Sequence, residues 1–116
     1  MIHMLSSFDL KPGEDFATFQ SDYADFVADL RAAGIIEGAG PLGARVSDTP
    51  MDTDDERDHS YYSVLSFRDR AQLDAAYAHI EAHRRPGTDT HLKMYRRVTN
   101  SIFLCWEDQP FEKERA

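Results

Sequence analysis

Residues 98–106 read VTNSIFLCW, and both alternating sets of side chains in this stretch include large apolar residues. Successive side chains of a β-strand point to opposite faces of the sheet. One face would carry Val98, Asn100, Ile102, Leu104 and Trp106, and the other Thr99, Ser101, Phe103 and Cys105. A strand with one face in water should alternate between apolar and polar residues, so this stretch predicts a sheet that is covered on both faces.

Residues 60–67, SYYSVLSF, have the composition of a second strand of the same kind. Large apolar or aromatic side chains occur on both of its faces. A second copy of the chain is the simplest cover for the second face, and we therefore expect a homodimer. The alternative is a monomer in which Ser63, Ser66 and Ser101 leave an open, partly wet sheet.

Helical spacing occurs on either side of these strands. From Glu14 onward the apolar residues fall three and four positions apart, and Gly34 is a natural end for this helix. Asp69 and Gln72 form a capping box at the start of a second helix, which we expect to continue up to Pro86-Gly87.

The remaining segments complete the order of elements. Residues 2–8 form a short apolar strand, and residues 42–47 alternate like a half-exposed strand after a loop at residues 38–41. Residues 88–97 fit one or two additional helical turns before the last strand. The order strand, helix, strand, strand, helix, strand predicts a ferredoxin-like α+β fold with a four-stranded antiparallel sheet.

With this order, a long loop between the second and third strands and an extra segment before the last strand, residues 2–106 resemble the dimeric α/β-barrel superfamily. That superfamily includes antibiotic-biosynthesis monooxygenases, stress-responsive barrel proteins and haem-degrading enzymes. The resemblance implies that two sheets join into a barrel in the dimer and that each subunit has a ligand pocket between sheet and helices. The haem-degrading branch places an Asn on the first strand and a Trp on the third, and this sequence has neither there.

Composition excludes several other classes of function. The chain has 116 residues, a net charge of -8 and an isoelectric point near 4.9, which argues against binding nucleic acid or an acidic membrane. No signal peptide or membrane-spanning run is evident, so we expect a cytoplasmic protein. We expect residues 1–106 to form a single domain and residues 107–116 a charged tail.

Basic and titratable residues gather near the end of the second helix, although the protein as a whole is acidic. They are His83, Arg84, Arg85, His91, Lys93, Arg96 and Arg97. As a binding site, this segment would attract a carboxylate or phenolate, with His91 or His83 as the catalytic proton acceptor. The alternative is structural, because cations favour helix C-termini and pair with acids elsewhere.

Four further residues are candidate ligand-binding groups. Arg45 and Asn100 are polar residues on strands that we expect to be substantially buried, and Tyr62 and Tyr95 could orient an aromatic compound. We expect no metal site. The pair His79 and His83 lacks a third ligand, and the acidic residues of the long loop lack the spacing of a calcium loop.

Two functions remain open from the sequence. One is a cofactor-independent oxygenase or isomerase that acts on a small aromatic compound, and the other is a non-catalytic dimeric ligand-binding or stress-response protein. An apolar cavity beside His91 and Arg45 is required by both hypotheses, whereas a solid interior would exclude both.

Overall fold

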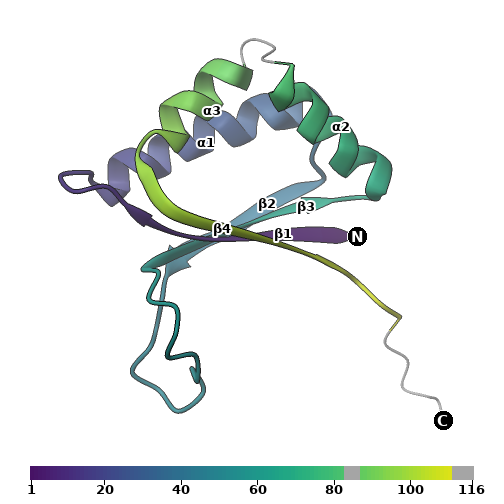
Figure 1. Cartoon of the computed structure of the whole chain (residues 1–116). Coiled ribbons are helices and arrows are strands. Elements are labelled where there is room, and N and C mark those ends of the chain that lie inside the picture. Colours follow the sequence, from purple (N-terminus) through teal and green to yellow (C-terminus); the bar gives the residue numbers. More distant parts are fainter. Residues whose placement is uncertain (83–86, 111–116) are drawn as a thin grey trace.

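The predicted order of elements is confirmed by the computed structural model, which describes residues 1–82 and 87–110 (Figure 1). The strands are β1 (Ile2–Leu10), β2 (Gly38–Ala44), β3 (Tyr61–Phe67) and β4 (Val98–Glu107), and the helices are α1 (Phe16–Ala32), α2 (Arg70–Glu81) and α3 (Gly87–Tyr95). The sheet is antiparallel with the order β2-β3-β1-β4, as a ferredoxin-like fold requires. The three helices all lie on one face of it (Figure 1).

Local signals define the helices. Asp15 caps α1 by accepting a hydrogen bond from the Thr18 amide at 3.1 Å, and Gly34, with a φ of 71°, follows its last turn. In α2, Asp69 accepts from the Gln72 amide, as the capping box predicts, but the helix ends at Glu81 rather than near Pro86-Gly87. Among the residues described, no helix is long and apolar enough to cross a membrane.

The core lies between α1 and the sheet. The apolar face of α1 contributes Phe19, Phe26 and Leu30, which pack with Phe8 of β1 and Phe67 of β3. The rings of Phe8 and Phe19 are in contact, with their centroids 5.1 Å apart. The aromatic spacing in residues 16–30 therefore positions α1 over the middle of the sheet.

The expected bounds of the second strand, residues 42–47, were wrong. β2 begins at Gly38 and ends at Ala44, so the whole segment that we expected to be a loop, residues 38–41, belongs to the strand. Its register with β3 shifts between Ala39 and Leu42. β2 is an edge strand, and edge strands tolerate a proline such as Pro41 at an irregularity because one side needs no ladder hydrogen bonds.

A bulge in β4 changes the predicted faces of the last strand. Asn100 has a φ of 59°, and the register between β1 and β4 shifts at this point. The extra residue reverses the alternation, so that Val98 lies on the helix side with Ser101 and Phe103 rather than with Leu104. Asparagine suits this position because it adopts left-handed backbone angles more readily than most residues.

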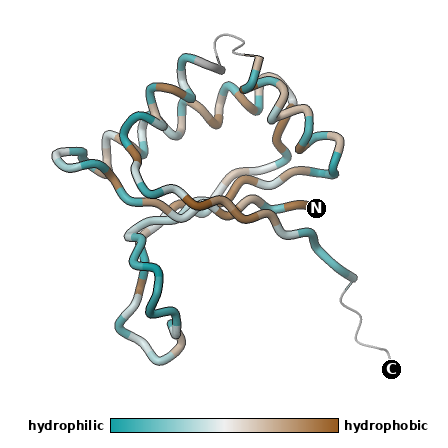
Figure 2. The backbone as a smooth tube through the Cα atoms, in the orientation of Figure 1, coloured by the Kyte–Doolittle hydropathy of each residue, from teal (hydrophilic) through white to brown (hydrophobic). Residues whose placement is uncertain are grey.

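The opposite face of the sheet is uncovered in the single chain. Leu5 of β1 pairs with Val64 of β3 on one side and with Leu104 of β4 on the other, which makes a continuous apolar row. Ile102 and Trp106 extend this row along β4, and both are exposed. We call these five residues the outer face. Figure 2 shows the hydrophobic colouring of the strands where they cross, in contrast to the hydrophilic loop that projects from the same side of the sheet.

Candidate functional site

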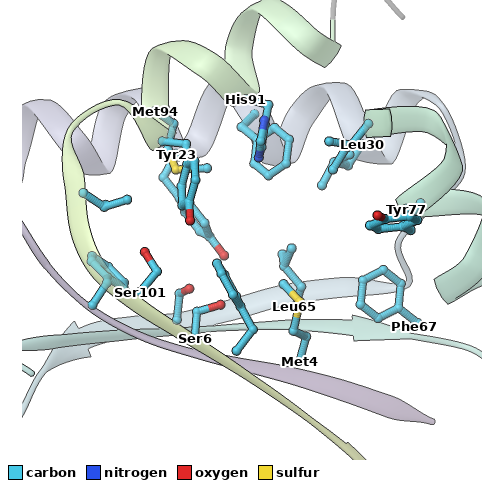
Figure 3. Close-up of a pocket in the computed structure, with 18 of the residues that line it drawn as sticks. Met4, Ser6, Tyr23, Leu30, Leu65, Phe67, Tyr77, His91, Met94 and Ser101 are labelled. Atoms are coloured by element: carbon cyan, nitrogen blue, oxygen red, sulfur yellow. The ribbon is translucent and has the colours of Figure 1, made fainter. Parts of the chain in front are cut away.

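A cavity of about 530 Å³ lies between the sheet and the helices. Its walls are mainly apolar, with Leu65 and Phe67 from β3, Leu30 from α1 and Met94 from α3 (Figure 3). A volume of this size suits a small organic ligand. The apolar cavity that both hypotheses require is therefore present beside His91, in the space that the resemblance implied.

Hydroxyl groups gather in one part of this apolar cavity. Ser6, Ser63 and Ser101 line it from β1, β3 and β4, and Ser6 lies directly opposite Ser63 in the ladder between β1 and β3. Tyr23 reaches from α1 toward the serines (Figure 3). We call these four residues the hydroxyl cluster, which gives the cavity one polar end.

Tyr23 is the least satisfied member of the hydroxyl cluster. The residue is 8% exposed, and its buried Oη has no hydrogen-bond partner among the residues described. Burial raises the pKa of Tyr23, and the nearby Ser63 hydroxyl offsets part of that rise without reaching hydrogen-bond geometry. Tyr23 is therefore a protonated donor at neutral pH whose hydrogen bond is available to a ligand.

His91 projects from α3 toward the sheet in the same cavity (Figure 3). Its ring lies 5.3 Å from Phe26 and 5.4 Å from Tyr95, measured between ring centroids, and the stack continues to Phe103 at 6.3 Å from Tyr95. This row of rings joins α1, α3 and β4. It fixes the plane of the His91 imidazole and brings two predicted site residues, His91 and Tyr95, to the same wall.

Of the lysine and arginine side chains described in the basic segment, Lys93 and Arg97 are paired with acids, and Arg96 is exposed. Arg97 donates hydrogen bonds to Asp22 at 2.7 Å and to Glu14 at 2.6 Å, and Lys93 lies 3.7 Å from Asp22. The guanidinium of Arg97 holds the pKa of the buried Asp22 below its usual value. Lys93 on α3 and Arg97, in the turn before β4, thus pair with acids in α1 and just before it, so the structural alternative explains these two cations.

Arg45 and Tyr62 lie on the other side of the sheet from His91. They line a second cavity of about 330 Å³ between Leu5 and the long β2-β3 loop. Arg45 donates to both carboxylate oxygens of Asp52 at 2.8 Å and to the carbonyl oxygens of Asp54 and Arg57. The acidic loop, which we expected to be solvated, is thus organised around Arg45, and the expectation that Arg45 lies beside His91 was wrong.

Two predicted site residues, Asn100 and His83, remain to be placed. Asn100 is exposed at the bulge of β4, where its side chain donates to Asp9 at 3.3 Å and its carbonyl oxygen bonds His59. In the single chain Asn100 is therefore exposed and not buried as expected, because β4 is an edge strand of the sheet. His83 lies outside the described residues.

No cluster of three or more His, Cys, Asp or Glu side chains in residues 1–82 and 87–110 could hold a metal ion. Arg45 occupies the centre of the acidic loop, where a cation would have to bind.

The hydroxyl cluster was missed in the sequence. Ser63 and Ser101 were read only as signs of a wet open sheet, and Tyr23 only as part of the apolar helix face. The available signal was the position of the serines, since inward-facing sites on adjacent strands normally carry large apolar residues. Three serines at such sites indicate a space rather than a packed core.

No protein-family model matches the chain, and no curated protein matches its sequence. Solved structures do match its fold. The Arabidopsis thaliana protein At3g17210 superposes with a TM-score of 0.74 at 6% identity, over 97% of this chain and 99% of that one. SnoaB from Streptomyces nogalater, a cofactor-independent oxygenase, has a TM-score of 0.60 at 14% identity and covers 97% of both chains.

A protein from Jannaschia described as dimeric and ferredoxin-like, of unknown function, matches with a TM-score of 0.57 at 14% identity, over 92% of this chain and 98% of that one. At such low identities these likenesses establish the fold alone. They confirm, at the level of fold, the resemblance to ferredoxin-like dimeric α/β proteins.

Proposed function

We propose that the protein is a homodimer whose subunits meet through the outer face. The five residues of this face form an apolar surface that no helix of the described chain covers, and Trp106 on it is 62% exposed. Contiguous apolar surfaces of this kind mark interaction sites. The dimeric state in the description of the Jannaschia neighbour supports the same arrangement.

We propose further that the main cavity binds a small aromatic compound. The observation that carries this proposal is the cavity itself, about 530 Å³ of mainly apolar space with hydroxyl groups and His91 in its wall. Aromatic side chains on several sides offer stacking and edge contacts to a flat ligand. The hydroxyl cluster fixes which end of the ligand lies against the sheet.

The reaction that fits this site best is proton removal from the bound ligand by His91. A neutral imidazole accepts a proton near physiological pH, and the ring stack holds it facing the cavity. In an isomerase the proton would return at another carbon atom of the ligand. In an oxygenase the resulting carbanion would transfer its electrons to O2 and form a carbon–oxygen bond. The peroxide would take up a proton, and loss of water with cleavage of the O–O bond would leave a carbonyl group on the ligand.

The second candidate is a binding protein without turnover. Hydroxyl groups and aromatic rings suffice to hold a ligand, and nothing in their arrangement requires a reaction. The two functions share the cavity and differ only in whether His91 moves a proton, so a substitution at His91 separates them.

The test begins with thermal unfolding in the presence of aromatic ketones, phenols and acids, because a ligand of the folded state raises the unfolding temperature. Bound compounds are then assayed for O2 consumption and for isomerised product. His91→Gln should retain binding and lose turnover by roughly a hundredfold or more. His79→Gln, a histidine of α2 that does not line the cavity, is the matched control.

If no compound shifts the unfolding temperature, the binding proposal is wrong. If a compound binds but no product forms in the unsubstituted protein, the non-catalytic function is supported instead.

A further inference from the structure

We infer that the hydroxyl cluster binds the uncharged carbonyl oxygen of the ligand, so that the main cavity selects neutral aromatic ketones over aromatic carboxylates. This inference rests on the proposed function, because it assumes that the cavity binds a ligand. It replaces the earlier expectation of a carboxylate ligand.

The hydroxyl cluster contains a hydrogen-bond donor without a partner in the described chain. Tyr23 Oη is buried at the polar end of the cavity and has no partner within the described chain. A buried hydroxyl without a partner is unfavourable, so an acceptor that reaches it gains a full hydrogen bond. A carbonyl oxygen accepts two hydrogen bonds and could therefore bond Tyr23 and one serine of the cluster together.

The charges around the cavity disfavour an anionic ligand. None of the described residues that line the cavity is a lysine or an arginine, and Asp74 contributes a carboxylate to its wall. Among the cations described on the neighbouring segments, Lys93 and Arg97 are paired with Asp22 and Glu14, and Arg96 is exposed and does not line the cavity. A carboxylate would have to leave water without a lysine or an arginine beside it, and His91, the one described lining residue that could become a cation, is neutral in the proposed reaction. Burying such a charge costs far more than transferring a neutral carbonyl group.

The serines of the hydroxyl cluster lie close together on three adjacent strands. Ser6 and Ser63 are opposite each other on adjacent strands, and Ser101 lies on the next strand on the same side of the sheet. Hydroxyl groups thus come from three strands, with Tyr23 above them (Figure 3). Apart from His91 and Asp74, the remaining walls are mainly apolar, so the hydroxyl cluster is the one group of hydrogen-bond donors from the sheet that a ligand meets in the described cavity.

The experiment uses three probes of similar size, namely fluorenone, fluorene and fluorene-carboxylate, titrated at neutral pH into the full chain and into Tyr23→Phe. We expect fluorenone to bind at least about tenfold more tightly than the carboxylate. Tyr23→Phe should weaken fluorenone about fivefold to tenfold, the factor for one ordinary hydrogen bond, and leave fluorene unchanged.

Infrared spectra of bound fluorenone provide a readout that a merely structural role would not change. A hydrogen bond from Tyr23 lowers the carbonyl stretching frequency, so this frequency should rise in Tyr23→Phe. Tyr61→Phe is the matched control, because it removes a phenolic oxygen that does not line the main cavity. It should change neither affinity nor frequency.

The outcomes separate the two levels of the proposal. Carboxylate affinity equal to or greater than that of fluorenone would overturn the inference and leave ligand binding intact. So would an equal loss of fluorene and fluorenone affinity in Tyr23→Phe, since Tyr23 would then only shape the cavity. Failure of all three probes to bind would overturn the proposed function and the inference together.

Discussion

Leu104→Asp should convert the proposed dimer into a monomer without unfolding the subunit. Leu104 lies on the outer face next to Leu5 and is 48% exposed in the single chain. An aspartate there remains in water as long as the subunit is alone. In a dimer that joins two outer faces, the same carboxylate would be buried against apolar residues of the partner.

The size of the effect follows from burial. Covering the exposed half of a leucine side chain contributes about 1 kcal/mol, and a twofold interface counts it twice, which gives about 2 kcal/mol. Burying two unpaired carboxylates costs at least about 2 kcal/mol more. A total of about 4 kcal/mol weakens the dimer roughly a thousandfold.

Sedimentation velocity at low micromolar concentration measures the change directly. The chain has one tryptophan, Trp106, and its emission should lie at longer wavelength in Leu104→Asp because the ring returns to water. Leu92→Asp is the matched control. Leu92 is 55% exposed on α3, away from the outer face, so its substitution should leave the dimer intact. Equal sedimentation of the two variants would refute an interface on this face.

Tyr23→Phe should raise the free energy of unfolding of the ligand-free protein by about 1 kcal/mol in urea denaturation, because it removes an unpaired buried hydroxyl, and a loss of stability would contradict this view. Asp22→Asn should flatten the acid dependence of thermal unfolding. Arg97 lowers the pKa of Asp22 in the folded protein. The stability that ionised Asp22 contributes is therefore full above its unfolded pKa of about 3.9 and is lost as the pH falls through its lower folded pKa. If the unfolding temperature of the variant and that of the unsubstituted protein depended on pH in the same way, the pair would contribute nothing to stability. Arg45→Ala should make the β2-β3 loop sensitive to limited proteolysis, because Asp52 loses its bidentate partner, whereas unchanged cleavage would show that other contacts organise the loop.

The helices and the order of strands could be predicted because their signals are local. Phe19, Tyr23 and Phe26 follow helical spacing within a few residues of one another, and Asp69 with Gln72 forms a cap that depends on four consecutive residues. Such patterns do not depend on what the rest of the chain does. They define each element before any long-range contact is known.

The faces of β4 could not be predicted because they depend on a single inserted residue. Strict alternation puts Val98 on the same side as Leu104, whereas the bulge at Asn100 puts them on opposite sides. The residues around Asn100 in the sequence do not show that it lacks a pairing partner on β1. The pairing partner, which lies far away in the chain, determines the bulge.

The sequence brought together only those residues of the candidate site that lie on one helix. His91 and Tyr95 are four residues apart on one helix, so they reach the cavity together. Arg45 and Tyr62 belong to strands and a loop whose side of the sheet depends on register, and they lie on the other side. Sequence spacing relates residues within a helix, but it does not relate residues on different faces of a sheet.

The volume and the polarity of the main cavity have a common origin in its serines. Ser6 and Ser63 occupy inward positions where valine or leucine would fill space, and each additional buried methylene would contribute about 0.8 kcal/mol to stability. The same small side chains place hydroxyl groups under Tyr23. Filling the space with apolar residues would therefore remove the polar end as well. The core thus lacks the stability that larger apolar side chains at these positions would contribute. A ligand that matches both the volume of the cavity and its hydroxyl groups is the simplest explanation.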